Sequence, residues 1–466
     1  MKSIYRSALS YSATTLAAQL MHTVFNFYYV KVFLNHYKIS DSWFYFAHTT
    51  YMLWNAVNDP VFGWLQDNSK LPCVRRRHLA ILYGAPVFVL SFLLPWFSWG
   101  NDQSPPWVTG LHLIVSLWLY DAMFTYVLLA QCALFTEISY DNNDRHTVLK
   151  FNQIGSIIGS TSVFWCELIS HNLQYMARFQ ICCVVIACLS LTFFTYTGSM
   201  IRAATSSDLS DKGDELSSNS SGSIFKLVFD LLRQRNFVCF VAINFFQIFH
   251  NTFGSNFFSI FSASLLSDGS VSSIARTFLS GSAFAVPQLL VLLTSPLLST
   301  LGSYYLILYS FYFKLLMALG MYVAGPSYTW LLAAYFLLDR SIPEAVFSLF
   351  MMPLSHIIDE DKRLHKRSQP ISSTVYGTNA LFTKPAQSLA PMFVVGILST
   401  YGYEKGTSFE AASTSTELKM AMFGLLCGIP LVVSVFQIAI WKQYTIRRPQ
   451  GRASSENDEY SVVQNV

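Results

Sequence analysis

The sequence predicts an all-α protein that crosses a membrane twelve times, in two halves of six helices each. Of its 466 residues, 53% are hydrophobic and only 12% are charged, whereas about 25% are charged in a typical soluble domain. Apolar runs of about 20 residues, long enough to cross a bilayer as helices, recur along the whole chain. A polar stretch rich in Ser, Asp and Asn follows the sixth run and divides the chain into the two halves.

The expected spans follow one another with polar loops between them. The first should be retained rather than cleaved as a signal peptide, because no small-residue cleavage site follows it. The linker, 203–223, cannot form a core, so 1–202 is the N-terminal half, 224–443 the C-terminal half and 444–466 a tail. The spans are expected at 8–34, 43–66, 79–99, 107–138, 151–173, 179–201, 237–262, 277–300, 303–325, 328–357, 372–400 and 420–442.

The distribution of Lys and Arg predicts that both termini are cytoplasmic. Cytoplasmic loops carry an excess of these residues. If the N-terminus is inside, most of them fall in inner segments. The outer loops then hold only Lys38, Arg178, Arg276, Lys405 and Lys419. The plasma membrane is favoured over endosomes, although Tyr460 begins a short tail sequence that matches a tyrosine-type sorting signal.

The sequence contains no arrangement typical of an enzyme. It has no HExxH pair, phosphate-binding Gly-rich loop or nucleophile elbow, and its eight cysteines form no CxxC motif. We therefore expect no catalytic residues, no bound metal and no cofactor. Its basic residues follow membrane topology, which argues against nucleic-acid binding. The expected partners are the lipid bilayer and a small-molecule substrate, and the chain is expected to be a monomer.

Charged residues inside the expected spans indicate transport. Asp59 lies in the apolar second span, and a charge at that depth costs at least about 2.5–3.5 kcal/mol. Such a residue usually faces a cavity and a partner. Asp121 lies one helical turn before Thr125 on the same face of the fourth span, and Lys384 lies in the eleventh span. Asp121 is a candidate proton acceptor or an acid bonded to neighbouring hydroxyls.

The loop after the second span carries a recognisable signature. Gly63 and Asp67 are followed by the basic cluster Arg75, Arg76 and Arg77. This spacing resembles the second-to-third loop of the major facilitator superfamily. The resemblance implies a fold of twelve helices and a cytoplasmic gate formed by these five residues.

A finer resemblance is to the glycoside-pentoside-hexuronide:cation symporters. The second-span motif of that family matches Asn55, Asn58 and Asp59 with the following Pro60 and Gly63, its fourth-span threonine matches Thr125, and its eleventh-span lysine matches Lys384. The resemblance implies a cation site at Asn55, Asn58, Asp59 and Thr125, with Na⁺ or H⁺ as the coupling ion. The stretches WNAVNDPVFGWLQD and SNFFSIFSASLLSD, at 54–67 and 255–268, further resemble a group of animal orphan carriers.

The chain also departs from that family. Asn55 replaces the first carboxylate of the cation site. Leu128 stands where the family has a sugar-binding acid, and Cys132 stands where it has a sugar-stacking Trp. Sodium–melibiose coupling therefore does not carry over, and an Asp59–Lys384 pair would need no sodium.

Two further polar groups are expected to line a substrate cavity. On the seventh span, Asn244, Gln247, His250 and Asn251 share one helix face. Asn152 and Gln153 open the fifth span. These six residues are the expected cavity lining.

Three other features carry expectations. Lys314, in the middle of the ninth span, should pair with Asp339 or Glu344, because a charge in lipid needs a partner. Glu167, near the outer end of the fifth span, is expected to meet water. Residues 224–233 space their apolar positions like a surface helix, or else extend the seventh span.

These observations favour a secondary transporter that moves a small sugar-like or amphipathic solute by alternating access. Two alternatives remain open. One is lysolipid transport, in which Lys384 holds a phosphate group. The other is a receptor or scaffold that has lost its coupling acids, as the residues at Asn55, Leu128 and Cys132 would suggest.

Overall fold

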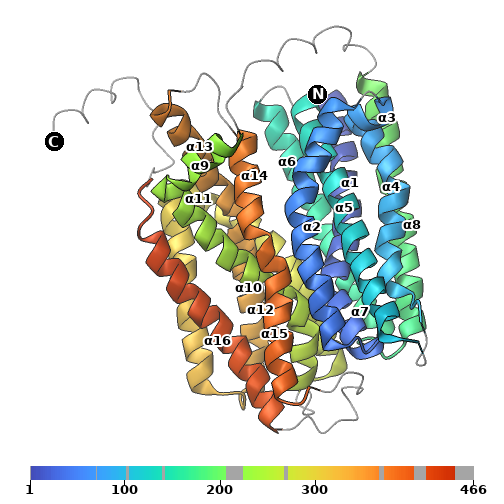
Figure 1. The fold of residues 1–466 in the computed structure, drawn as a ribbon, viewed down its shortest axis with the longest axis vertical. Coiled ribbons are helices and arrows are strands. Elements are labelled where there is room, and N and C mark those ends of the chain that lie inside the picture. Colours follow the sequence, from blue (N-terminus) through green and yellow to red (C-terminus); the bar gives the residue numbers. More distant parts are fainter. Residues whose placement is uncertain are drawn as a thin grey trace, which may run out of the picture.

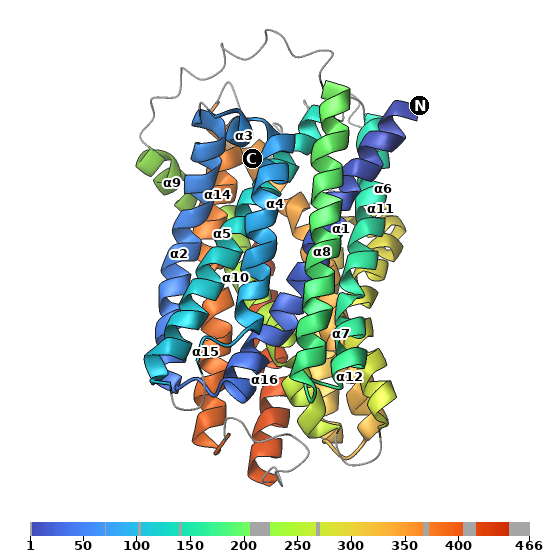
Figure 2. The same cartoon turned by 90° about the vertical axis from the view of Figure 1, so that its right-hand side faces the viewer.

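The computed structural model describes residues 2–69, 71–100, 104–138, 142–205, 224–266, 271–366, 372–403 and 416–446, and these residues form helices without strands (Figure 1). Two groups of long, roughly parallel helices lie side by side, one from each half of the sequence (Figures 1 and 2). The main helices of the N-terminal half are α1 (Lys2–Lys31), α2 (Asp41–Asn68), α4 (Arg77–Leu93), α5 (Pro106–Ile138), α6 (Asn142–Ser160), α7 (Ser162–Ser170) and α8 (Met176–Thr205).

The C-terminal half repeats this arrangement. Its longest helix, α11 (Ser273–Ala324), is two helices joined at Gly302, whose φ of 74° lies in a region that favours glycine. The expected eighth and ninth spans meet at this kink. The other helices are α10 (Arg235–Leu265), α12 (Thr329–Phe347), α13 (Met351–Leu364), α14 (Ser372–Thr383), α15 (Pro385–Thr400) and α16 (Thr416–Trp441).

Short elements connect these helices. A π-helical turn, η1 (Val32–His36), ends α1, and 3₁₀ turns η2 (Leu94–Trp96) and η3 (Ser348–Phe350) follow α4 and α12. The four-residue helix α3 (Pro72–Arg75) lies between α2 and α4.

Nine helical stretches of the described residues are long and apolar enough to cross a membrane. The three remaining expected spans, at 8–34, 43–66 and 151–173, coincide with α1, α2 and the α6–α7 pair, which contain more polar residues. An integral, multi-pass membrane protein is therefore confirmed, and the number of twelve spans stays a prediction.

The residues after the linker form a separate helix, α9 (Ile224–Leu232). Gln234 has an extended backbone (φ −79°, ψ 117°) and separates α9 from α10. The stretch is therefore not an extension of the seventh span. The expected linker lies largely outside the described residues, as does the tail with Tyr460.

Close packing inside the N-terminal half depends on two glycines of α6. A Cβ atom added at Gly155 would lie 2.8 Å from the backbone oxygen of Ser12, and one at Gly159 would lie 2.9 Å from that of Leu16. Because only glycine lacks this atom, α6 can approach the backbone of α1 directly.

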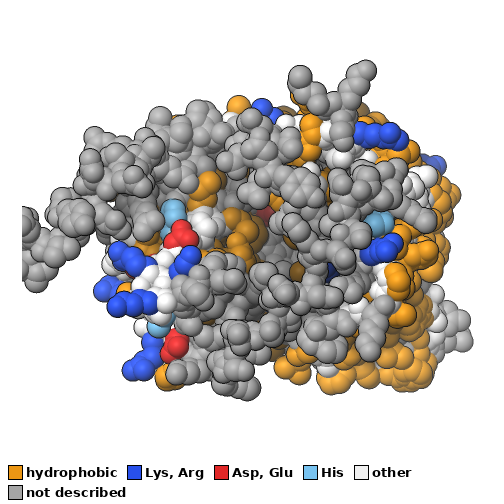
Figure 3. Space-filling view, turned by 90° about the horizontal axis from the view of Figure 1, so that it is seen from above, with side chains coloured by type: hydrophobic (Ala, Val, Ile, Leu, Met, Phe, Trp, Pro, Cys, Tyr) orange, Lys and Arg blue, Asp and Glu red, His pale blue; other side chains and the backbone are white. Residues whose placement is uncertain are grey.

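The two halves contact each other through α1 with α10, α2 with α15, and α7 with α11. We call the end of the bundle where α1 begins the N-terminal face and the opposite end the far face (Figure 1). Lys and Arg side chains are visible on the N-terminal face (Figure 3), as expected for a cytoplasmic surface.

Hydrogen bonds between the halves join them at the far face. Lys31 of α1 donates to Ser259 of α10 over 2.6 Å, and Ser259 donates to Asn172 over 3.2 Å. The hydroxyl of Tyr29 accepts from Asn256 at 3.0 Å. Tyr403 donates to Asn35 at 2.7 Å. We call these four hydrogen bonds the far-face closure.

Glu167 corrects one expectation. Its side chain is buried and accepts a 2.6 Å hydrogen bond from the Tyr28 hydroxyl. Helix α7 begins just after Thr161, and it places the Glu167 carboxylate against α1. Its place near the end of the expected span therefore predicted its exposure wrongly.

Candidate functional site

Lys384 and Asp59 form an ion pair between the two halves. Lys384 Nζ lies 2.5 Å from Asp59 Oδ1, and the Thr125 hydroxyl donates to the same oxygen at 3.3 Å. Lys384 lies at the break between α14 and α15, where Pro385 cannot donate a backbone hydrogen bond. Interrupted helices of this kind surround substrate and ion sites in many transporters.

Asp121 lies beside this pair and accepts hydrogen bonds from neutral groups. The Tyr51 hydroxyl donates to Oδ1 at 3.2 Å, and the Asn58 amide donates to Oδ2. The Asn55 amide donates to Gln387 Oε1 of α15 over 2.9 Å. We call Asn55, Asn58, Asp59, Asp121, Thr125 and Lys384 the charged centre.

Two side-chain oxygens of the charged centre have no hydrogen-bond donor. The side-chain oxygens of Asn55 and Asn58 are buried and accept no hydrogen bond. They lie in the same group as the two carboxylates and the Thr125 hydroxyl. Oxygen ligands are those that hard cations prefer, so the residues fit a small cation. Among the described residues, no group of three or more His, Cys, Asp or Glu side chains could hold a metal ion.

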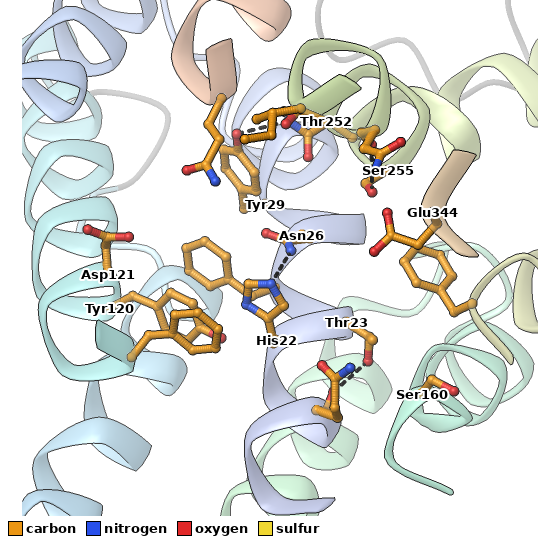
Figure 4. A pocket seen from close by; sticks show the side chains of 18 of the residues that line it. His22, Thr23, Asn26, Tyr29, Tyr120, Asp121, Ser160, Thr252, Ser255 and Glu344 are labelled. Carbon is orange, nitrogen blue, oxygen red and sulfur yellow. Dashed lines mark hydrogen bonds between the residues drawn. The ribbon is translucent and has the colours of Figure 1, made fainter. Parts of the chain in front are cut away.

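A cavity of about 250 Å³ lies between the halves next to the charged centre (Figure 4). It is lined by polar and aromatic side chains from both halves. Asp121 and Tyr51 join it to the charged centre. Its other polar lining includes Gln19, His22, Thr23, Asn26, Tyr29, Ser160, Asn251, Thr252, Ser255, Asn256, Gln288, Arg340, Glu344 and Gln387.

Of the expected seventh-span lining, only Asn251 reaches this cavity. The other three residues contact neighbouring helices. Asn244 donates to Asn379 at 3.1 Å, Gln247 donates to the Pro343 carbonyl at 2.7 Å, and His250 lies 3.2 Å from Asp339. The spacing correctly places these residues on one helix face, but α12 and α14 cover part of that face.

The two expected fifth-span residues also lie behind the lining. Gln153 donates to the cavity residue Gln288 over 3.0 Å. Asn152 accepts a hydrogen bond from Thr15. Gln153 therefore supports the cavity through Gln288, and neither residue lines it.

The expected gate is only partly described. Arg77 donates to Gln66 over 3.2 Å, and Gln66 donates to the Tyr126 carbonyl at 2.7 Å. Arg76 is exposed. The side chains of Asp67 and Arg75, and the surroundings of Gly63, lie outside what the structure describes.

Lys314 makes its hydrogen bond to a neutral group instead of the expected ion pair, although the expected Asp339 acts on the ammonium electrostatically. The Lys314 ammonium donates to the neutral Gln437 amide oxygen at 2.6 Å. Glu344 instead accepts from Arg340 at 2.9 Å, and Asp339 lies beside His250. The sequence could not rank the possible acceptors on neighbouring helices.

Several cavity residues were missed by the sequence analysis. His22 and Asn26 line the cavity from α1 and lie 2.8 Å apart. Their i, i+4 spacing within an apolar helix is a signal that could have found them. Glu344 was considered only as a partner of Lys314. Nothing local marks Gln387 as a cavity residue.

The fold and the cavity define a membrane transporter with the major facilitator architecture. The chain resembles the crystal structure of a mutant of the nucleoside transporter NupG, with a TM-score of 0.62 and 13% identity over 94% of this chain and 98% of that one. It also resembles a bacterial homologue of the human lysosomal transporter Spinster, in an inward-facing, unoccupied conformation, with a TM-score of 0.60, 12% identity and coverage of 94% and 96%. At these identities the likeness shows the fold alone.

The model of the MFS/sugar transport protein family matches residues 10–448, and the chain belongs to this family. Transmembrane protein 180 of Gallus gallus is 30% identical over 479 residues, which cover 94% of this chain and 92% of the relative. The Mus musculus protein of the same name is 29% identical with the same coverage. Both the expected superfamily and the expected group of animal orphan carriers are confirmed, and the protein is a transporter rather than an enzyme.

Proposed function

We propose that the protein is a secondary transporter that moves a small polar solute by alternating access, coupled to Na⁺ or H⁺. The observation that carries this proposal is the Lys384–Asp59 ion pair, because it joins the halves beside a cavity that both halves line. In carriers of this architecture the halves rock around a central site. An ion pair at that place responds to any movement of one half against the other.

The far-face closure supports a direction for the cavity. Its four hydrogen bonds join the halves at the far face, in addition to the contacts of Gln153 and Ser156 with Gln288, and we infer that the cavity of this conformation opens towards the N-terminal face. With both termini cytoplasmic, this is an inward-facing state, and Gly63, Asp67, Arg75, Arg76 and Arg77 would close the cytoplasmic side in the opposite state. The protein acts as a monomer in the plasma membrane in this proposal.

The charged centre supports coupling in two ways. Two donor-free amide oxygens, two carboxylates and a hydroxyl suit Na⁺, although Asn55 contributes less charge than an acid. Asp121, bonded only by neutral groups, suits a proton. A cavity of about 250 Å³ suits a small solute better than a lysolipid with its acyl chain.

The test is the melting temperature of the purified protein in NaCl against KCl, between pH 5.5 and 8, for the wild type and Asp59→Asn. A sodium-dependent stabilisation lost in Asp59→Asn supports a sodium site. A pH response that is independent of sodium and lost in Asp59→Asn or Asp121→Asn supports proton coupling. Asp339→Asn is the matched control, because this carboxylate faces His250 away from the charged centre. If neither ion acts, the coupling proposal fails, and an uncoupled transporter or the receptor or scaffold alternative takes its place.

A further inference from the structure

The charges that line the cavity are unbalanced. Two carboxylates reach it from opposite halves, Asp121 from α5 and Glu344 from α12. Figure 4 shows them on opposite sides, with His22 and Asn26 between them. The only lysine or arginine among the described lining residues is Arg340.

The charged centre has one carboxylate more than its cations balance. Lys384 is the one cation among its described residues, and its ammonium is 2.5 Å from Asp59. Asp121 receives only the neutral donors Tyr51 and Asn58. Neutral donors do not cancel the charge of a carboxylate, and the single ammonium of Lys384, which also acts on Asp121 electrostatically, cannot balance both acids. The centre therefore presents a net negative charge to the cavity when Asp121 is ionised.

The opposite wall presents no free cation among the residues that line it in the described part of the chain. The Arg340 guanidinium donates to Glu344 at 2.9 Å and lies 5.0 Å from the ring centre of Phe284, and its side chain is only 7% exposed. The Glu344 side chain is 29% exposed and extends into the cavity. The nearby Asp339 lies beside His250. An anionic solute would therefore meet carboxylate oxygens on both walls.

Aromatic rings form the surface between the two acids. Phe25 stacks on Tyr120 with ring centres 3.8 Å apart, and His22 stacks on Phe124 at 4.3 Å. The Asn26 amide donates to Nε2 of His22, which suits a neutral imidazole. Aromatic faces attract ammonium groups and are used to recognise quaternary ammonium ligands.

We propose that the transported solute is a small organic cation, an ammonium compound held between Asp121 and Glu344 against these rings. The inference rests on the proposed transport function and names its substrate class. Binding such a cation neutralises the excess charge, and it draws together two walls that belong to different halves. A neutral polyol would satisfy the hydroxyl and amide groups of the lining but would leave the charge uncompensated.

The experiment compares three ligands of nearly equal shape on the full-length protein. Choline carries the charge, 3,3-dimethylbutan-1-ol is its uncharged carbon isostere, and glycine betaine adds a carboxylate. Their binding is measured by melting temperature and by calorimetry at millimolar concentration, with tetramethylammonium and ethanolamine as further ammonium probes. The expected result is that at least one ammonium ion binds while the neutral isostere does not.

The variants Asp121→Asn and Glu344→Gln test the two walls separately. Each should weaken ammonium binding about tenfold or more, because an interaction with a charged group is lost. Asp339→Asn, which removes a nearby acid outside this cavity, should bind like the wild type. If one variant does not fold, the other variant and the comparison of charged and neutral ligands in the wild type still test the inference.

Two results would overturn the proposal: equal binding of choline and its neutral isostere, or no binding of choline, tetramethylammonium or ethanolamine. A sodium or pH response that persists in the wild type under either result would leave the proposed transport function standing. Loss of that response together with selective ammonium binding would instead indicate a binding protein without coupling.

Discussion

Replacing Ser259 by alanine is expected to open the far-face closure without disturbing either half. The Ser259 residue is 1% exposed, accepts from Lys31 Nζ over 2.6 Å and donates to Asn172 over 3.2 Å. Alanine fits the same space but removes both hydrogen bonds. When the halves separate on this side, water solvates Lys31 in both forms, so the substitution destabilises only the closed state.

The magnitude follows from the two lost hydrogen bonds. A hydrogen bond to a charged group contributes about 1.5–3 kcal/mol and a neutral one about 0.5–1.5 kcal/mol. Lys31 keeps Asn172 of its own half as an acceptor, so the lower end of the first range applies. The two losses together come to about 2–3 kcal/mol. Since about 1.4 kcal/mol corresponds to a factor of ten, the equilibrium should move towards the open state by a factor of about 30 to 150. Replacing Lys31 itself would be less informative, because burying its charge also costs free energy in the closed state.

The measurement is the distance between spin labels on the two halves at the far face. Trp107, at the start of α5, and Tyr328, just before α12, are exposed positions for the labels in a variant without native cysteines. The Ser190→Ala substitution is the control: this buried hydroxyl donates to the Ala17 carbonyl within one half. It should lower stability without changing the distances.

The result that refutes this reasoning is specific. If Ser259→Ala lowered the melting temperature as Ser190→Ala does but left the distance distribution unchanged, the contact would stabilise the fold without acting as a gate.

Three further substitutions test other contacts. Gly159→Ala forces a Cβ to 2.9 Å from a backbone oxygen of α1 and should cost about 1–3 kcal/mol, measured by melting; an unchanged melting temperature would contradict the close approach. Tyr28→Phe removes the donor to buried Glu167 and should cost about 1.5–3 kcal/mol, with little further loss when Glu167→Gln is added; additive losses would argue against their contact. Gly281→Ala puts a Cβ 2.6 Å from Cβ of Phe164, across the halves. It should raise the open fraction in the same distance measurement, and an unchanged fraction would show that the helices adjust.

The sequence motif predicted part of the charged centre. Asp59 and Lys384 are 325 positions apart, and their charges alone predicted only that each needs a partner. The family resemblance suggested that they are partners, and the structure places them in contact. The resemblance did not indicate that Tyr51 and Asn58 would donate hydrogen bonds to Asp121. Tyr and Asn occur at many positions, and the sequence does not show which of them reach a given acid.

The cavity lining was harder to predict for a physical reason. Helical periodicity shows that His250 and Asn251 belong to one polar face, but not which neighbouring helix covers each position. A rotation of α10 by a fraction of a turn decides whether a residue meets Asp339 or the cavity, and packing of the whole bundle sets that rotation. The mostly apolar helix α1 contributes His22 and Asn26 because its place in the bundle, rather than its composition, puts them there.

The strength of the far-face closure bears on what a transported ligand must supply. Three neutral hydrogen bonds at about 0.5–1.5 kcal/mol each and one charged bond at about 1.5–3 kcal/mol give roughly 3–7.5 kcal/mol. Moving a two-state equilibrium from 1:99 to 99:1 takes about 5.5 kcal/mol of differential binding. The closure is therefore weak enough for ligand and ion binding to reverse, yet strong enough to keep the unloaded cavity shut on that side. A cation that bridges Asp121 and Glu344 contacts the same two halves. Any difference in its affinity for the two conformations therefore shifts the equilibrium between the closed and the open far face.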